Sequence, residues 1–163
     1  VATDTLFVPR RPQTPVGPLP YEVETVTVDC GDHVMTGELT LPRGEGRCAA
    51  VVLVSGSGQQ NLDEELFAHK PFRVLADYLT RNGVAVLRYN DRGIGGSTGE
   101  VAEATTMDFA ADAEKTVARL AGLPGLSAAK EEKRSFFVSA FHFTQIRVEF
   151  LFTHFIRFSA EFT

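Results

Sequence analysis

The alternation of apolar and polar residues changes along the chain, and the change predicts two kinds of strand. Residues 26–28 alternate valine with threonine, and after a turn at residues 30–32 a second alternating segment covers residues 35–41. Alternation with a period of two is typical of strands with one buried face, so these segments predict an antiparallel hairpin. Residues 49–54 and 84–89 are almost continuously apolar, which indicates strands of a parallel sheet covered by helices on both faces.

Two segments have helical periodicity. Pro71 suits the first turn of a helix, apolar residues recur at helical spacing over residues 72–79, and Gly83 can follow the last turn as a cap. Residues 105–108 (TTMD) resemble a capping box, and apolar residues continue one helical face over residues 109–120. The chain therefore alternates strand, helix, strand and helix after the hairpin.

This order predicts the fold class. A strand, helix and strand in succession form a right-handed crossover in nearly all α/β proteins, so the hairpin should lead into a parallel sheet flanked by helices. We expect this α/β domain over residues 21–125. Residues 1–20 precede it as an arm or linker, because five of the eight prolines fall within residues 7–20.

Residues 126–163 form a Phe-rich tail in which the pattern is lost. From residue 135 onward the chain has nine of its thirteen phenylalanines and neither glycine nor proline. Periodicity favours neither strand nor helix here, and the parallel strand expected next is not evident. The tail is interpreted as non-native sequence after a change of reading frame. A native amphipathic segment and a membrane-associated stretch are the alternatives.

Composition limits the function classes. Apolar residues make up 44% and charged residues 23%, as in soluble globular domains. A net charge of -5 argues against nucleic acid and anionic membranes as partners. The chain begins at Val1, so a signal peptide has been removed or was never present, and the compartment stays open. Cys30 and Cys48 lack metal-ligand spacing and are read either as a disulfide or as two buried small residues.

The loop at residues 55–58 (SGSG) follows the first buried strand. Glycines let backbone N–H groups point at an oxygen that becomes negative in an acyl-transfer transition state, so Gly56 and Ser57 are oxyanion-hole candidates. An ordinary flexible loop or a phosphate cradle is the alternative. The phosphate motifs fail, because the third glycine of G-x-G-x-x-G and any G-K-[ST] are missing.

A second motif, DRGIGGS at residues 91–97, follows the second buried strand. Asp91 and Arg92 are expected either to pair and brace the neighbouring loops or to cap the strand end, with Gly93 completing this structural support. Together with the SGSG loop, the segment at residues 63–79 (DEELFAHKPFRVLADYL) resembles the EstD-like bacterial esterases. These are related to the serine aminopeptidase-type α/β-hydrolases.

The resemblance covers residues 11–125 and implies a carboxylic ester hydrolase with a Ser-Asp-His triad, acting on a small-molecule ester without cofactor or metal. The matching positions supply scaffolding and part of the oxyanion hole. Two positions depart from the family, since Leu62 stands where an arginine is common and Asn90 where an aspartate is common. The oligomeric state stays open.

The family nucleophile lies in a G-x-S-x-G elbow after the next strand. Residues 95–99 match these letters, but Ser97 lies between a strand ending near Tyr89 and a helix beginning near Thr105, so we expect a structural turn role. The chain is therefore predicted to lack the catalytic serine and its triad partners and to be inactive. The alternatives are a non-catalytic remnant that binds an acyl ligand or a partner through an unpaired sheet edge, and a nucleotide-binding domain.

The four histidines give weaker signals. His33 falls in the hairpin turn and is expected to be solvated, whereas His69 precedes a helix and is expected to make a local hydrogen bond. His142 and His154 lie in the tail, where the sequence predicts no acidic partner for them.

Overall fold

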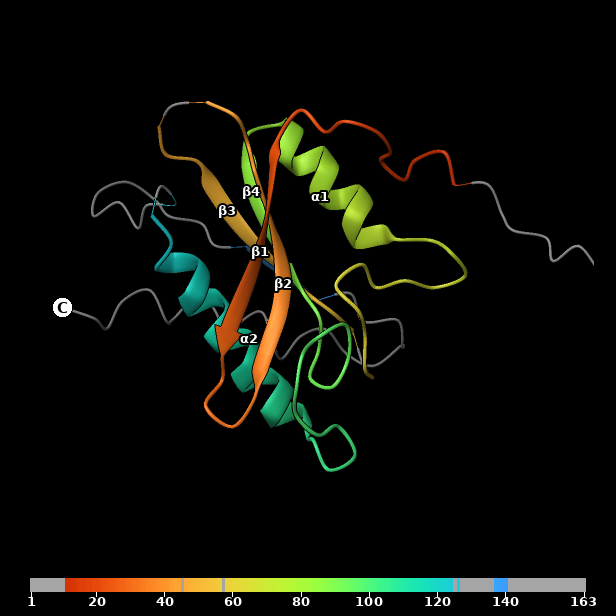
Figure 1. The fold of residues 1–163 in the computed structure, drawn as a ribbon, viewed down its shortest axis with the longest axis vertical. Coiled ribbons are helices and arrows are strands. Elements are labelled where there is room, and N and C mark those ends of the chain that lie inside the picture. The colour runs from red at the N-terminus through yellow and green to blue at the C-terminus, as the bar shows by residue number, and fades with distance from the viewer. Residues whose placement is uncertain (1–10, 45, 57, 125, 127–136, 141–163) are drawn as a thin grey trace, which may run out of the picture.

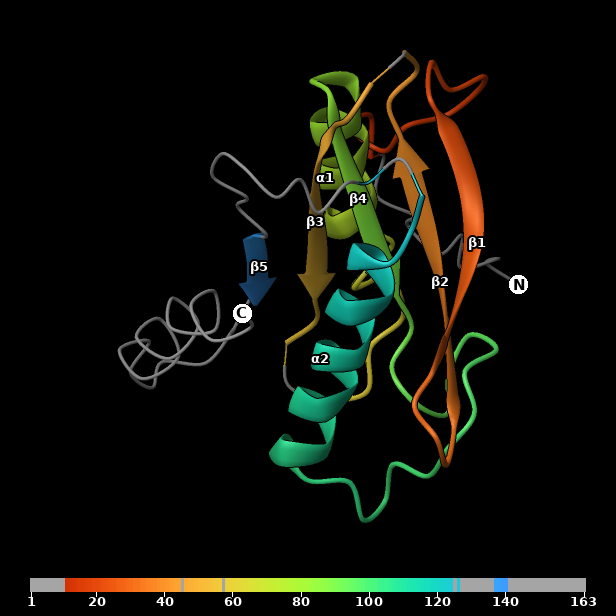
Figure 2. The same cartoon turned by 90° about the vertical axis from the view of Figure 1, so that its left-hand side faces the viewer.

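A five-stranded mixed sheet with a helix on each face forms the centre of the molecule (Figures 1 and 2). The computed structural model describes residues 11–44, 46–56, 58–124, 126 and 137–140. The strands are β1 Glu22–Asp29, β2 Val34–Leu41, β3 Ala49–Val54, β4 Val84–Tyr89 and β5 Phe137–Ala140, and the helices are α1 Pro71–Arg81 and α2 Thr106–Ala121. Across the sheet the strand order is β1-β2-β4-β3-β5.

The predicted hairpin is confirmed. β1 pairs antiparallel with β2, and the alternating positions Val26, Val28, Met35 and Leu39 are buried on one face. β2 also pairs antiparallel with β4 at Gly37, and this pairing attaches the hairpin to the parallel strands. A side chain at Gly37 would collide with backbone atoms of β4, so the close approach of the two strands requires glycine.

The parallel part of the sheet has an apolar core on each face. β3 and β4 pair in parallel, and successive residues of each strand point to opposite faces. Val52 and Leu87 belong to the core under α2, which includes Leu120. Val51, Leu53 and Val86 pack against Phe72 and Ala76 of α1 in the other core. The continuous apolar runs in the sequence thus reflect strands buried on both sides, as the α/β prediction requires.

Both helices begin where the sequence indicates. Pro71 occupies the first turn of α1, and Gly83 has a φ of 84°, just beyond the C-cap residue. Thr105 and Asp108 form both halves of a capping box at α2. The buried face of α2 differs from a simple apolar stripe, because it includes the polar residues Asp112 and Thr116 beside Leu120.

The expectation that no parallel strand follows residue 125 is wrong for residues 137–140. β5 pairs in parallel with β3 and continues the sheet beyond it. An unpaired strand edge presents N–H and C=O groups that any extended segment of suitable geometry can bind, and four residues are too few to give a clear periodicity. Our interpretation of the remaining tail, with His142 and His154, concerns residues outside the described ranges, as does the first half of the N-terminal arm.

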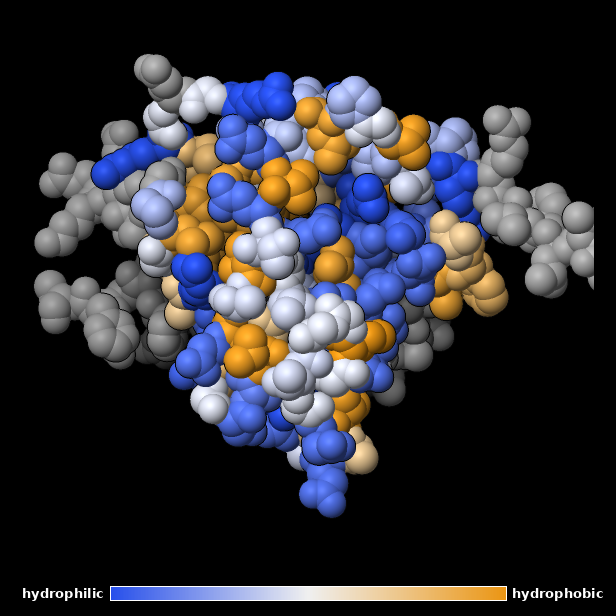
Figure 3. Space-filling model, viewed as in Figure 1, coloured by the Kyte–Doolittle hydropathy of each residue, from blue (hydrophilic) through white to orange (hydrophobic). Residues whose placement is uncertain are grey.

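Neither helix in the described ranges is both long enough and apolar enough to cross a membrane. On the face seen in Figure 3, hydrophilic residues surround separate apolar groups. Val23 and Val34 of the hairpin are among the partly exposed apolar residues, with exposures of 45% and 38%. Scattered apolar residues of this kind are common on protein surfaces.

We expect Gly37→Ala to lower the free energy of unfolding by about 3 kcal/mol, because the added carbon displaces β2 from β4. Urea denaturation followed by circular dichroism measures the change. Gly122→Ala is the control, since Gly122 has a helical φ of -86° and its new carbon would lie 3.6 Å from the nearest atom. A loss no larger than that of the control would contradict the assigned strand contact.

Candidate functional site

The loops that follow β3 and β4 lie side by side and are joined by one buried carboxylate (Figure 1). Asp91 follows β4 and is 3% exposed. Its carboxylate accepts hydrogen bonds from the Ser55 hydroxyl at 2.9 and 3.1 Å and from the Gln60 N–H at 2.8 Å. The Asp91 N–H donates in return to the Gln60 carbonyl at 3.1 Å. These contacts fix the β3 loop to the end of β4.

Burial raises the pKa of Asp91 above its usual range, although the hydrogen bonds from Gln60 and Ser55 oppose the shift. The charge of Asp112 adds a smaller increase to this pKa. The ionised carboxylate is therefore less favourable in the folded chain than in the unfolded chain. Its hydrogen bonds reduce this penalty without removing it.

Gly56, near the start of the same loop, already binds an acidic oxygen. Its N–H donates to Glu64 Oε1 at 3.2 Å. Glu64 has a φ of 50°, and its other oxygen, Oε2, is buried without a hydrogen-bond partner. Burial raises the pKa of Glu64, and the Gly56 N–H lowers it in part. Ser57 lies outside the described residues, so its assignment to the oxyanion hole stays a prediction.

Arg92 binds Asp112 of α2 rather than Asp91. Its Nε and Nη2 atoms each donate to the Asp112 carboxylate at 2.9 Å, and its guanidinium carbon lies 5.8 Å from the centre of the Phe109 ring. Among the described residues no ion pair joins Asp91 to Arg92. The idea that these two residues pair with each other is wrong, because each faces a different element. Asp91 faces the β3 loop and Arg92 faces α2.

Gly93 directly follows Arg92 and has a backbone conformation that favours glycine. Its φ is 76°, and a side-chain carbon would lie 3.0 Å from the Gly99 carbonyl and 3.1 Å from Gln59 Nε2. The Gln59 side chain in turn donates to the Arg92 carbonyl at 2.9 Å. A larger residue at position 93 would strain the backbone and separate these neighbouring loops.

Ser97 has the geometry of a structural residue. Its hydroxyl donates to the Asn90 carbonyl at 3.0 Å and accepts from the Thr36 N–H at 2.9 Å, and the residue is 8% exposed. Its own N–H closes a turn onto the Ile94 carbonyl at 2.8 Å. A nucleophile needs a base beside a free hydroxyl. The hydroxyl of Ser97 instead joins the loop to β2.

The side chain of Asn90, at a position where an aspartate is common, also has a structural role. Its Oδ1 accepts from the Leu62 N–H at 2.8 Å, and its Nδ2 donates to the Gly95 carbonyl at 3.1 Å. The amide thus links the two loops with a donor and an acceptor, which an ionised aspartate could not do. Both positions at which the sequence departs from the family pattern meet in this contact.

His69 makes a local contact at the entry to α1, as expected. Its Nδ1 lies 3.3 Å from Gln13 Nε2, and its N–H donates to the Leu66 carbonyl at 2.9 Å. No acidic partner of its ring is recorded among the described residues.

Sequence reasoning missed a buried ion-pair network centred on Arg88. Arg88 is 2% exposed and binds Asp63, and its Nη2 lies 2.6 Å from Glu38 Oε2. Lys70 lies 3.4 Å from the other oxygen of Asp63. The signal available in the sequence was an arginine inside an otherwise apolar strand, because a buried charge requires a partner.

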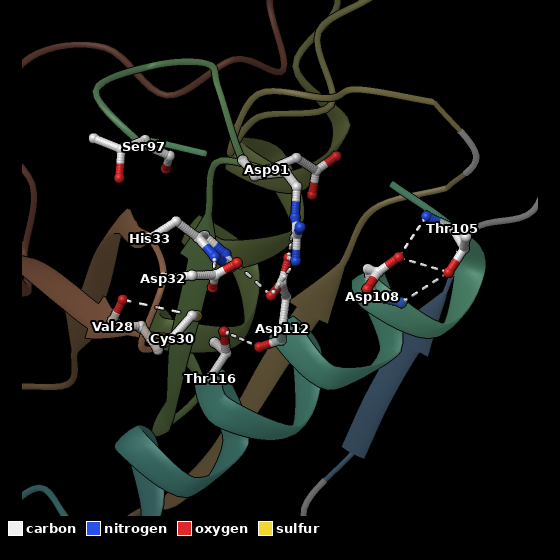
Figure 4. A network of polar contacts seen from close by, with 12 residues as sticks. Val28, Cys30, Asp32, His33, Asp91, Ser97, Thr105, Asp108, Asp112 and Thr116 are labelled. Carbon is white, nitrogen blue, oxygen red and sulfur yellow. Dashed lines mark hydrogen bonds and ion pairs between the residues drawn. The ribbon is translucent and has the colours of Figure 1, made fainter. Parts of the chain in front are cut away.

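A second missed cluster joins the hairpin turn to α2 (Figure 4). The expectation that His33 is solvated is wrong, because its side chain is 2% exposed and packs against Asp112. Cys30 lies beside them, and its pKa is raised to about 11 by burial and by the charge of Asp112. One donor atom from each of Cys30, His33 and Asp112 lies within 4.8 Å of the others. Cys30 and Cys48 are both free thiols, so the disulfide alternative is wrong.

Comparison with known proteins identifies the fold. No protein-family model matches the chain. The chain is 39% identical over 77 residues to Esterase EstD of Thermotoga maritima, a match that covers 47% of this chain and 18% of that protein. The chain is thus a partial homologue of an esterase and spans about a fifth of its length.

Two solved structures are similar in fold. Est1E from Butyrivibrio proteoclasticus with bound ferulic acid has a TM-score of 0.57 at 18% identity, covering 71% of this chain and 41% of its own. The hypothetical protein PA2218 of Pseudomonas aeruginosa has a TM-score of 0.57 at 19% identity, covering 78% and 36%. At such low identity these matches show only the fold, which is that of the α/β-hydrolases.

The raised pKa of Asp91 predicts a pH dependence. Because the pKa of Asp91 is higher in the folded chain, the unfolded chain loses this proton at a lower pH than the folded chain does. The contribution of Asp91 to stability therefore falls as pH rises from the unfolded-state pKa through the folded-state pKa. Asp91→Asn keeps an accepting oxygen and cannot ionise. We expect the stability of Asp91→Asn relative to the unsubstituted chain to increase from about pH 4 to about pH 7.

Urea denaturation at several pH values measures this difference. Asp108→Asn is a control of opposite sign, because hydrogen bonds from Thr105 lower the pKa of Asp108. For that carboxylate the contribution to stability is present above its unfolded-state pKa and is lost as pH falls through the folded-state pKa. A constant difference between Asp91→Asn and the unsubstituted chain over this range would show that Asp91 is not a desolvated carboxylate.

Proposed function

We propose that this chain, which has part of the α/β-hydrolase fold and a segment homologous to Esterase EstD, supplies the oxyanion side of a carboxylic ester hydrolase. We also propose that the 163 residues by themselves do not hydrolyse esters. The observation that carries the proposal is the Gly56 N–H just after β3, which binds a carboxylate oxygen at 3.2 Å.

Ester hydrolysis by a serine enzyme places negative charge on the former carbonyl oxygen. Backbone N–H groups that already point at this position stabilise the charge without reorganisation. In this chain the Asp91 carboxylate holds Ser55 and Gln60, which flank the segment that contains Gly56. The donor is therefore held in place before any substrate arrives.

Glu64 occupies the position that the substrate oxygen would take on Gly56, so it must move when an ester binds. Its Oε2 atom lacks a hydrogen-bond partner and its backbone has a φ of 50°, both of which disfavour the present arrangement. Displacement of Glu64 by a substrate should therefore require little free energy.

The absence of an activated serine among the described residues supports the proposed inactivity. The sequence has one G-x-S-x-G segment, at residues 95–99, and its Ser97 hydroxyl is bound to Asn90 and Thr36. A serine hydrolase requires a histidine beside the attacking hydroxyl and an acid beside that histidine. The part of the chain that the structure describes offers Ser97 neither group. This chemistry needs no cofactor.

Two assays test the proposal. The chain should hydrolyse p-nitrophenyl acetate no faster than its Ser97→Ala variant or a buffer blank, because the described residues present no activated serine. A chimera in which residues 21–125 replace the corresponding part of Esterase EstD should be active. In that chimera Ser57→Pro, which deletes an N–H, should lower kcat/KM about a hundredfold.

Ser57→Ala is the matched control in the chimera, because it removes the hydroxyl and keeps the N–H. Its kcat/KM should stay close to that of the chimera. Equal losses in both variants would show that the hydroxyl matters and that the oxyanion assignment is wrong. Hydrolysis by the isolated chain that Ser97→Ala abolishes would overturn the proposed inactivity.

A further inference from the structure

We propose that Cys30, His33 and Asp112 form a zinc site that fastens the hairpin turn between β1 and β2 to helix α2. This inference is independent of the proposed esterase function. Cys30 directly follows β1, His33 directly precedes β2, and Asp112 lies in the second turn of α2. Figure 4 shows the three side chains converging from these elements. Their sulfur, nitrogen and oxygen donor atoms lie within 4.8 Å of one another.

The arrangement around His33 points to a cation. Asp32 Oδ1 lies 2.7 Å from His33 Nδ1 and accepts the proton of that nitrogen. This leaves the lone pair of Nε2 free, and Nε2 lies 3.1 Å from Asp112 Oδ1 yet makes no hydrogen bond. Two acceptors at this distance repel each other unless a positive charge lies between them. The imidazole side chain is 2% exposed, so bulk water does not relieve the repulsion.

The contact between His33 and Asp32 is also the usual second contact of a zinc-binding histidine. Such a histidine typically donates its other ring N–H to a carboxylate, which fixes the tautomer and the ring orientation. Asp32 is 82% exposed, and its carboxylate remains well placed to bind the ring. The histidine is therefore oriented for a ligand before the ligand binds.

Arg92 leaves room for the metal at Asp112. Each carboxylate oxygen has two lone pairs, and Arg92 Nη2 uses one of those on Oδ1. The other can bind a cation. The carboxylates of Asp32 and Asp112 and the thiolate of Cys30 then balance the charges of Arg92 and one divalent ion. A neutral cluster avoids the large free-energy penalty of unpaired buried charge.

The donor set favours zinc among the divalent ions. Thiolate and imidazole are the ligands that zinc prefers, a carboxylate oxygen is an accepted third, and water can complete the tetrahedron. Calcium and magnesium select oxygen donors instead. On binding, the Cys30 thiol releases its proton to solvent and the sulfur binds the metal. Cys30 is only half-buried, which gives the ion a route to the site.

Metal binding to the full chain tests the site. After treatment with EDTA and a thiol reductant, the chain should bind one equivalent of Zn²⁺ in competition with a chromophoric chelator. Co²⁺ in place of Zn²⁺ should give a sulfur-to-cobalt charge-transfer band in the near ultraviolet. Cys30→Ser should abolish that band, and Asp32→Asn, at an exposed position, should weaken Zn²⁺ binding about tenfold.

Cys48→Ser is the matched control, because Cys48 is the other free and half-buried thiol. It should leave the affinity and the cobalt band unchanged. If Cys30→Ser does not fold, two other measurements decide. The unsubstituted chain should show the cobalt band, and His33→Gln should lower the affinity for Zn²⁺. The absence of stoichiometric binding, or binding that Cys30→Ser and His33→Gln leave unchanged, would overturn the proposal. If a proton rather than a metal ion lies between His33 and Asp112, no stoichiometric binding of Zn²⁺ will be found.

Discussion

The buried carboxylate of Asp91 is the interaction on which the candidate site depends. It receives hydrogen bonds from Ser55, at the start of the loop after β3, and from Gln60, five residues further along that loop. Parallel strands bring their carboxyl ends to the same edge of a sheet, but they leave the loops there free to move. One acceptor with several lone pairs can hold such a loop against the end of the next strand. Burial of an ionised carboxylate is unfavourable unless hydrogen bonds replace its water. The loop supplies these hydrogen bonds, so a loop that moved away would leave the carboxylate buried without partners.

The residues after Asp91 extend this support in two directions. Arg92 binds Asp112 and thereby fixes the loop to α2, whereas Ser97 binds Thr36 and fixes it to β2. The polar segment of residues 90–99 thus acts as a junction between the hairpin, the parallel strands and a helix. The chemistry proposed for the β3 loop needs only a backbone donor in a fixed position, which a junction of this kind provides.

Much of the fold could be predicted from local patterns. The period of the apolar residues gave β1 to β4 and both helices, and residues 105–108 gave the start of α2 through the capping box. Contacts between distant segments could not be predicted in this way. The partners of Arg92 and the burial of His33 depend on how α2 crosses the hairpin, and this crossing leaves no periodic signal. β5 was missed because four residues are too few to show a periodic pattern. Such a strand becomes evident only from its pairing with β3 in the structure.

The same distinction applies to the candidate site. The glycines of the β3 loop predicted a backbone donor for an oxyanion, and that role stays a prediction. The Gly56 N–H donates to Glu64, and nothing local in the sequence indicated this partner. Residues 30–33 gave a cysteine and a histidine of one turn, while the third member of their cluster, Asp112, lies far along the chain. Side chains that meet only through tertiary packing have to be found in the structure.

Amide hydrogen exchange at Gln60 tests most directly whether Asp91 holds the β3 loop. In the unsubstituted chain the Gln60 N–H should be protected by its 2.8 Å bond to Asp91. Asp91→Ala should speed its exchange about tenfold or more, since a hydrogen bond to a charged group contributes roughly 1.5–3 kcal/mol. The amide of Val86, buried in β4, should stay protected. Unchanged exchange at Gln60 in a folded Asp91→Ala variant would contradict the account.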